Sequence, residues 1–331
     1  MTFLVTGSSG HLGEALVRTL QAQGRKVVAI DIRPGAFTHR VGSTTDRDFV
    51  ARCMKGVTAV LHAATLHKPH VATHSRQDFV DVNITGTLNL LEAAAREKVA
   101  AFVYTSTTSV FGDALVPPPG EPAAWITESV VAVPKNIYGV TKAAAEDLCQ
   151  LFARNHSLAA VVLRTSRFFP EKDDNPAIRE AYEDANVKVN EFLYRRVDIE
   201  DVVSAHLLAA DHARSAGFAK FIISATTPFS RDDVQALRSV APQVVRRYAP
   251  DSEVEYARRG WTMPAGIDRV YANDKARAEL GWRPRHDFHS AIVRLKENRD
   301  FRSALAQAIG SKGYHDRAFT DGPYPVERKR P

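Results

Sequence analysis

Two residues near the middle of the chain could act together in proton transfer. Tyr138 and Lys142 are four residues apart in Tyr-Gly-Val-Thr-Lys, so they share one face if this segment is helical. A nearby ammonium group favours the phenolate and so lowers the pKa of a tyrosine. A tyrosine with a lowered pKa can serve as a general base near neutral pH. The spacing therefore predicts a catalytic pair.

A run of hydroxyl side chains precedes this pair. Ser106, Thr107, Thr108 and Ser109 directly follow the apolar stretch 101–105, which predicts a β-strand. Hydroxyls at the end of a strand could meet an oxygen atom of a substrate. The run is therefore a candidate for binding the group on which the tyrosine acts.

A glycine-rich turn lies at the N-terminus, between a short predicted strand and a predicted helix. Its sequence, Thr-Gly-Ser-Ser-Gly-His-Leu-Gly, covers residues 6–13. Glycines at this spacing allow a tight turn, close approach of the backbone to a pyrophosphate, and close packing of the helix. The N–H groups at the start of the helix then face the phosphates. The predicted cofactor-binding residues of the turn are Gly7, Ser9, Gly10, His11, Leu12 and Gly13.

Asp31 ends the second predicted strand, where a carboxylate can bind the ribose hydroxyls of adenosine. This position predicts NAD rather than NADP as the cofactor. Arg33 leaves NADP open as the alternative, because an arginine can hold a 2′-phosphate. Ile32 lies between them and is predicted to contact the cofactor as well.

The elements that must position these residues alternate between strand and helix. This alternation predicts a parallel sheet with helices on both faces. The predicted strands cover residues 3–5, 27–30, 57–62, 101–105, 160–163 and 221–225, and the predicted helices residues 11–23, 77–98, 136–156 and 199–212.

Composition excludes several classes of protein. The chain has 331 residues, of which 44% are hydrophobic, and a net charge of +6, which together describe an ordinary globular protein. No basic stripe interleaved with aromatic residues predicts nucleic-acid binding, and no apolar run approaches the ~18 residues of a membrane span. Cys53 and Cys149 are expected to be reduced thiols, and no signal peptide is recognised, so we expect a cytoplasmic protein. The histidines at 67, 70 and 74 lack an acidic or thiol partner, so no metal site is predicted.

Taken together, the motifs resemble those of the extended short-chain dehydrogenase/reductases, and specifically the NAD-dependent epimerase/dehydratase family that includes UDP-glucose 4-epimerase. The resemblance runs nearly end to end. The matching segments are residues 6–13, 62–64, 83–87, 106–112, Tyr138 with Lys142, 163–164, 197–202 and 280–284.

The resemblance implies a role for each matching residue. Tyr138 would be the catalytic base or acid, Lys142 would bind the nicotinamide ribose, and Thr107 would hydrogen-bond the reacting substrate oxygen. Other residues would lie along the cofactor or support the site: Ala63, Ala64, Asn83 and Ser106. A purely structural role for Asn83 remains the alternative.

Departures from the family pattern narrow the range of reactions and substrates that we expect. The 4,6-dehydratases carry an Asp-Glu pair after the catalytic threonine, but this chain has Thr108 and Ser109, which disfavours loss of water. Arg167 replaces an asparagine that commonly touches the sugar nucleotide, and an arginine could pair with a carboxylate or phosphate instead. Arg195 and Arg269 fall where relatives often bind a diphosphate, and ordinary surface charge is the alternative for both.

We therefore predict an NAD-dependent oxidoreductase that acts on a carbinol carbon of a sugar or nucleotide-sugar, most like a nucleotide-sugar epimerase. One alternative is a dehydrogenase of a smaller, acidic sugar derivative, which Arg167 and the short segment 170–195 favour. Another is a non-catalytic NAD-sensing protein, although such proteins typically lose the tyrosine or the lysine.

The resemblance also implies an architecture. A Rossmann-like, doubly wound parallel sheet of about seven strands would comprise residues 1–165 and 197–227. A smaller C-terminal α/β substrate lobe would comprise residues 166–196 and 228–310. The basic tail, residues 311–331, is expected to be a solvated terminus, and the two long helices are expected to form a homodimer interface.

Overall fold

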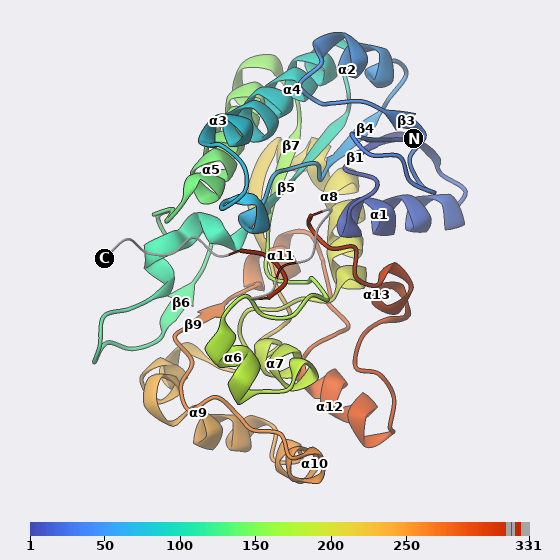
Figure 1. Cartoon of the computed structure of the whole chain (residues 1–331). Coiled ribbons are helices and arrows are strands. Elements are labelled where there is room, and N and C mark those ends of the chain that lie inside the picture. The colour runs from blue at the N-terminus through green and yellow to red at the C-terminus, as the bar shows by residue number, and fades with distance from the viewer. Residues whose placement is uncertain (316–318, 320–321, 326–331) are drawn as a thin grey trace.

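A seven-stranded parallel sheet forms the centre of the computed structural model, which describes residues 1–315, 319 and 322–325 (Figure 1). The strand order is β3-β2-β1-β4-β5-β7-β8, and neighbouring strands are parallel. This confirms the predicted doubly wound, Rossmann-like sheet. The strands are β1 (Thr2–Thr6), β2 (Lys26–Asp31), β3 (Arg40–Val41), β4 (Ala59–His62), β5 (Ala101–Thr107), β7 (Ala160–Thr165) and β8 (Phe218–Ile223).

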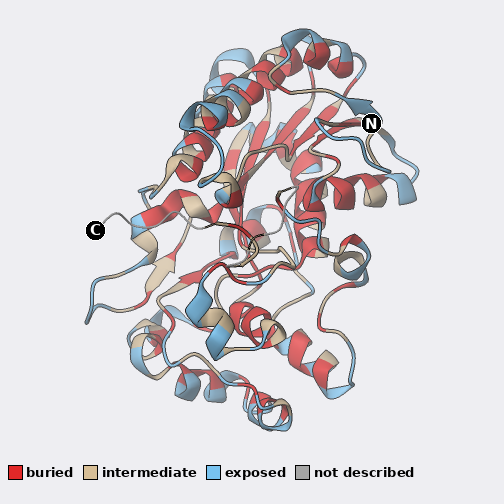
Figure 2. Ribbon diagram, viewed as in Figure 1, coloured by how far each residue is buried: buried red, intermediate tan, exposed pale blue. Residues whose placement is uncertain are grey.

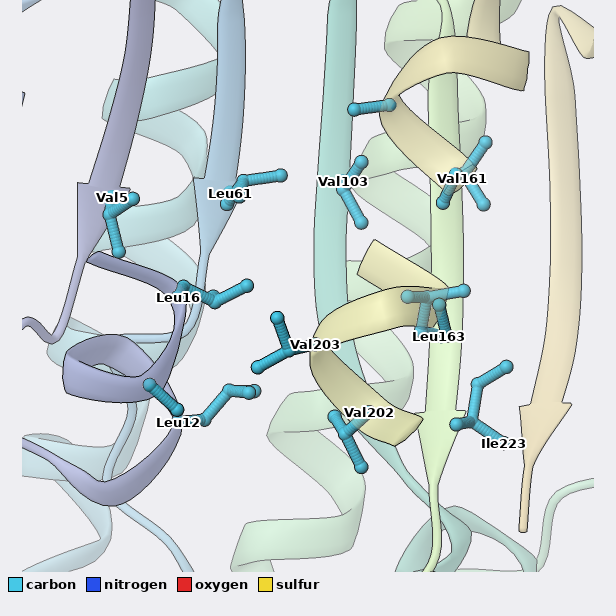
Figure 3. Close-up of a cluster of buried hydrophobic side chains, with 14 of the residues drawn as sticks. Val5, Leu12, Leu16, Leu61, Val103, Val161, Leu163, Val202, Val203 and Ile223 are labelled. Atoms are coloured by element: carbon cyan, nitrogen blue, oxygen red, sulfur yellow. The ribbon is translucent and has the colours of Figure 1, made fainter. Parts of the chain in front are cut away.

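Helices cover both faces of the sheet because successive side chains of each strand point to opposite faces. On one face, Val5, Leu61 and Val103 pack against α1 (His11–Ala22) and α8 (Ile199–Ala216), as Figure 3 shows. On the other face, strand residues such as Leu4, Val60 and Phe102 join the apolar core of three further helices. These helices are α2 (Arg47–Met54), α4 (Gly86–Arg96) and α5 (Ile137–His156). Figure 2 shows the buried residues concentrated in the sheet and on the inner sides of its helices.

The predicted helix over residues 77–98 is interrupted. It consists of α3 (Arg76–Phe79), a π-helical segment (Val80–Thr85) and α4. Phe79 and Leu90 are both fully buried, so residues before and after the π-helical segment face the interior. Asn83, one of the predicted site residues, lies inside this segment.

A second, smaller apolar core lies below the carboxyl edge of the sheet in Figure 1. It is built around a two-stranded parallel sheet of β6 (Ala124–Ile126) and β9 (Arg269–Tyr271). The sequence analysis placed the β6 residues with the cofactor-binding sheet, but Ala123 and Trp125 pack in this second core. Its helices are α6 (Pro176–Ala181), α7 (Asp184–Glu191), α9 (Val234–Tyr248), α10 (Ser252–Arg259) and α12 (Phe288–Lys296). The connecting helix α11 (Asp274–Glu279) packs near β8.

The chain after α13 (Ala304–Ile309) turns back over the molecule. Figure 1 shows this dark red segment crossing the middle of the molecule, between the sheet and the lower lobe. Tyr314 is only 7% exposed, so the expectation of a solvated terminus from residue 311 onward is wrong at this point. The basic residues at 328–330 lie outside the described part of the chain.

Two findings concern the expectations of reduced thiols and of no membrane-spanning segment. Cys53 and Cys149 are both buried, free thiols. None of the helices in the described residues is long and apolar enough to cross a membrane.

Candidate active site

The predicted catalytic residues meet where β5 ends and α5 begins. Thr107 is the last residue of β5, and Tyr138 lies in the first turn of α5, which begins after the N-cap Asn136. The Asn136 side chain accepts a hydrogen bond from the Gly139 N–H and so fixes the start of the helix. Both side chains line the same cavity, and the Thr107 hydroxyl is near enough to Tyr138 to lower its pKa. The structure thus brings the proposed base and its hydroxyl partner together.

Burial dominates the protonation of the catalytic pair. It raises the pKa of Tyr138 to about 12, although the nearby Thr107 hydroxyl opposes this rise. It also lowers the pKa of Lys142 to about 7, against the raising effect of the Glu146 charge. The sequence analysis expected Lys142 to lower the tyrosine pKa. That expectation fails here, because the ammonium group donates to the Thr105 carbonyl at 2.6 Å and lies over the Tyr104 ring.

Glu146, one helical turn beyond Lys142, organises the polar groups behind the catalytic pair. Its carboxylate is buried and accepts hydrogen bonds from Arg164, at 2.7 Å, and from Ser106, at 2.6 Å. Lys220 approaches the same carboxylate at 3.1 Å. Ser106 therefore faces Glu146, not the predicted cofactor contact. Burial alone would raise the pKa of Glu146, but Arg164 holds it below its usual value.

The glycine-rich turn has the close packing that a dinucleotide site requires. Gly7 has φ +73°, and a Cβ atom there would lie 2.9 Å from the backbone nitrogen of Ala64. A Cβ atom on Gly13 would lie 1.9 Å from the Gly7 carbonyl oxygen. Only glycine fits at these two positions, so the first turn of α1 can approach the loop and direct its N–H groups toward a phosphate.

The other predicted cofactor residues lie around this turn. The Asp31 carboxylate accepts hydrogen bonds from the Ser9 and Arg33 N–H groups, both at 2.9 Å. The backbones of Ala63 and Ala64 donate to Thr6 Oγ1 at 3.1 and 3.0 Å, which holds the end of β4 against the turn. By contrast, the side chain of Leu12 is buried in the core, and that of Ile32 is 66% exposed. The residues present therefore fit an adenine dinucleotide.

Asn83 has the structural role that the sequence analysis left open. Its amide oxygen accepts from the Leu66 N–H and the Thr65 hydroxyl, both at 2.9 Å. Its amide nitrogen donates to the Leu66 carbonyl and to Thr141 Oγ1, at 2.9 and 3.0 Å. These partners tie the loop after β4 to α5, one residue before Lys142. Asn83 therefore supports the site through protein contacts.

A large cavity opens beside the catalytic pair. Its volume is about 1470 Å³, and Thr107, Thr108 and Tyr138 line it on the side of the sheet. The second lobe contributes Tyr194, Arg195 and Arg269. The Nε atoms of Arg195 and Arg269 are buried without a hydrogen-bond partner, and a terminal nitrogen of Arg195 pairs with Glu191 at 2.8 Å.

Arg167 also lines the cavity, but it is not free to bind an anion as the sequence analysis expected. Its guanidinium group pairs with Asp173, Asp174 and Glu191. Glu191 is buried, and Arg195 and Arg196 approach it at 2.8 Å each. Burial alone would raise the pKa of Glu191, but the three arginines hold it well below its usual range. Arg167 therefore belongs to an ion-pair network in the cavity wall.

An aromatic group that the sequence analysis did not foresee closes one side of the cavity. The His67 ring lies 6.5 Å from the Tyr138 ring and stacks on Phe169 at 5.5 Å. Tyr314, from the C-terminal segment, contacts His67 edge-on at 4.9 Å. Burial lowers the pKa of His67 well below its usual value, so its imidazole is neutral. No cluster of metal-ligand side chains was found among the described residues.

A family model for the "NAD dependent epimerase/dehydratase family" matches residues 3–223. The chain belongs to this family. Its members are NAD-dependent enzymes of the extended short-chain dehydrogenase/reductase type, as the sequence resemblance implied. The matched residues include both the glycine-rich turn and the catalytic pair.

The individual relatives that match most of this chain have low sequence identity to it. A UDP-glucose 4-epimerase of Streptomyces lividans is 28% identical over 318 residues, covering 85% of this chain and 91% of the relative. A dTDP-glucose 4,6-dehydratase of Streptomyces antibioticus is also 28% identical, covering 89% of this chain and 91% of the relative. Three curated relatives of higher identity, 31 to 33%, are matched over only 40 to 66% of their own length.

Solved structures agree with the fold. A short-chain dehydrogenase/reductase superfamily protein from Agrobacterium tumefaciens, with bound NAD, is 25% identical. It superposes with a TM-score of 0.64, covering 90% of this chain and 98% of that one.

Proposed function

We propose that the protein is an NAD-dependent enzyme that oxidises a carbinol carbon of a nucleotide-sugar and acts as an epimerase. The observation that carries this proposal is the position of Tyr138 and Thr107 together at the wall of a cavity of about 1470 Å³. At this position, Tyr138 as the proton acceptor and Thr107 as the hydroxyl donor can both reach the same substrate oxygen. The likeness to a UDP-glucose 4-epimerase supports the substrate class.

In the proposed reaction, the phenolic oxygen of Tyr138 takes the proton of the substrate hydroxyl. The Thr107 hydroxyl donates a hydrogen bond to the same oxygen and holds it in place. When bound, NAD accepts the hydride that leaves the carbinol carbon, and its positive charge favours ionisation of the tyrosine. Lys142 would then hold the nicotinamide ribose, and Gly7–Gly13 with Asp31 would hold the pyrophosphate and the adenosine ribose.

The cavity favours a large anionic substrate. Its volume exceeds the 300–1000 Å³ or so of ordinary small-ligand pockets, so it accommodates a nucleotide as well as a sugar. Arg195 and Arg269 line the cavity, where their guanidinium groups would attract a diphosphate. The alternative of a smaller acidic substrate rested on the short segment 170–195 and on Arg167, whose charge is already balanced by Asp173, Asp174 and Glu191. Loss of water is disfavoured, because Thr108 and Ser109 have no acid–base capacity at neutral pH.

The proposal is tested by Tyr138→Phe, with UDP-glucose and related UDP-sugars as probes. We expect wild-type protein to interconvert a pair of 4-epimers, and Tyr138→Phe to lower turnover at least about 100-fold, because the proton acceptor is lost. The control Tyr182→Phe changes a tyrosine outside the residues that line the cavity. NAD binding should survive both substitutions.

Two results would contradict the proposal. Turnover that is unchanged in Tyr138→Phe would remove the base and with it the mechanism. NADH that accumulates in step with product, followed by its absorbance, would identify a net dehydrogenase, because an epimerase returns the hydride to its substrate.

We also propose that the chain forms a homodimer through the helices of the α4 and α5 layer. Val140 and Leu151 on α5 are 48% and 36% exposed, and their spacing of three helical turns places them on one side of the helix. Apolar side chains so arranged favour burial against a second copy. The molar mass from light scattering distinguishes the dimer from the monomer.

A further inference from the structure

The C-terminal strap, residues 310–315, fastens to a single buried carboxylate. Ser311 donates its hydroxyl to Glu171 Oε1 at 2.8 Å, and Tyr314 donates its hydroxyl to Glu171 Oε2 at 3.1 Å. The Lys312 N–H approaches Glu171 Oε1 at 3.3 Å. Glu171 lines the same cavity as Phe169, two residues before it, so the strap is held against the loop that leaves β7.

The same carboxylate contacts the glycine-rich turn. His11, the first residue of α1, lies 2.9 Å from Glu171 Oε1 through its Nε2 atom. The Lys312 N–H is 3.2 Å from this nitrogen, and the Lys312 ammonium pairs with Glu14 in the same turn of α1. One end of the strap therefore lies at the helix terminus predicted to hold the pyrophosphate.

The other end of the strap reaches the neighbourhood of the catalytic tyrosine. The Tyr314 carbonyl accepts a hydrogen bond from His70 at 3.1 Å, and the Tyr314 ring contacts His67. His67 in turn lies 6.5 Å, between ring centres, from Tyr138. The pyrophosphate of NAD is expected at the first end, beside α1, and its reactive ring at the second end, near Tyr138. The strap thus spans the nicotinamide half of the cofactor site, as its course in Figure 1 also indicates.

We propose that this strap retains the cofactor, so that NAD enters and leaves only when the strap is released from Glu171. The proposal rests on NAD being the cofactor, and it assigns Glu171, Lys312 and Tyr314 to retention, not to chemistry. Slow exchange of NAD would keep the reduced cofactor in place until it returns its hydride. The strap would then be the element that makes this chain an epimerase and not a dehydrogenase.

Electrostatics supports a latch at Glu171. Burial alone would raise the pKa of this carboxyl, but the hydrogen bond and charge of His11 and the Ser311 hydroxyl hold it at about 2. The group therefore stays ionised and keeps its donors throughout the neutral pH range. The imidazole groups of His11, on α1, and His70, in the loop after β4, also contact the strap.

The experiment measures the dissociation rate of labelled NAD, chased with excess unlabelled NAD. It compares wild-type protein with Glu171→Ala, Tyr314→Ala and a chain that ends at Gly310. Glu121→Gln is the control, because Glu121 is an exposed carboxylate outside the residues that line the cavity. We expect the three variants to release NAD at least about tenfold faster and the control to release it at the wild-type rate. Tenfold is the size that the loss of one hydrogen bond to a charged group would give.

The outcomes separate this proposal from the proposed function. Wild-type release rates in the shortened chain and in Tyr314→Ala, with NAD still bound, would overturn the strap's role and leave the catalytic assignment intact. Failure of the wild-type protein to bind NAD at all would overturn both. Because the two point variants leave the chain at full length, the result does not depend on the shortened chain folding.

Discussion

At the residue scale, the sequence pattern indicated the candidate catalytic groups but not the residues that surround them. Tyr138, Lys142 and Thr107 were predictable because their spacing on a helix and at a strand end is local. Glu146 also had a signal, since it lies four residues beyond Lys142 on the same helical face. Its partners Arg164 and Lys220 come from β7 and β8, however, and a single sequence does not show such pairings across the sheet.

Glu146→Gln should destabilise the protein because Arg164, only 5% exposed, would remain buried without its counter-charge. Breaking one side of a buried ion pair costs about 3–5 kcal/mol. We expect the free energy of unfolding, from denaturant titration, to fall by about that amount. An equal value in Glu146→Gln and wild-type protein would show that the pair contributes nothing. Glu97→Gln, at an exposed position, is the control.

At the element scale, the long and regular strands and helices were predictable, whereas the short ones were not. β3 has two residues and β6 has three, too few to show any periodicity. Each of these strands depends on pairing with a neighbouring strand: β3 pairs with β2, and β6 pairs with β9. The glycine-rich turn was predictable for the opposite reason, since the contact of Gly13 with Gly7 lies within eight consecutive residues.

Gly13→Ala should abolish NAD binding, because the new Cβ atom would lie 1.9 Å from the Gly7 carbonyl oxygen and force α1 away from the turn. Gly10→Ala provides a graded comparison, since its Cβ atom would lie 3.3 Å from the same oxygen. We expect the dissociation constant of NAD, from calorimetry, to rise much more in Gly13→Ala than in Gly10→Ala. Equal affinities in the two variants would contradict the packing argument.

At the scale of the whole molecule, three buried histidines connect the stability of the fold to pH. Burial lowers the pKa of His62 to about 3, and that of His70 and His206 to about 4. Their unfolded value is 6.5, so below this pH the unfolded chain binds more protons than the folded protein. Their stabilising effect is complete above pH 6.5 and is lost progressively as the pH falls toward 4.

We expect the free energy of unfolding to decrease between pH 6.5 and pH 4.5, by about 1.4 kcal/mol per pH unit for each such histidine. Denaturant titrations at several pH values measure this slope. His206→Gln should make the slope shallower, whereas His289→Gln, at an exposed position, should leave it unchanged. A wild-type stability independent of pH over this range would contradict the assignment of these histidines as buried and neutral.

The π-helical segment, residues 80–85, determines which side of α4 faces the interior relative to α3. A regular α-helix turns about 100° per residue, so removal of one residue, such as the exposed Asp81, would rotate α4 by that angle relative to α3. Either Phe79 or Leu90 would then leave the interior, and Asn83 would lose its alignment with the loop after β4. The segment therefore tolerates substitution at its exposed positions far better than a change of length.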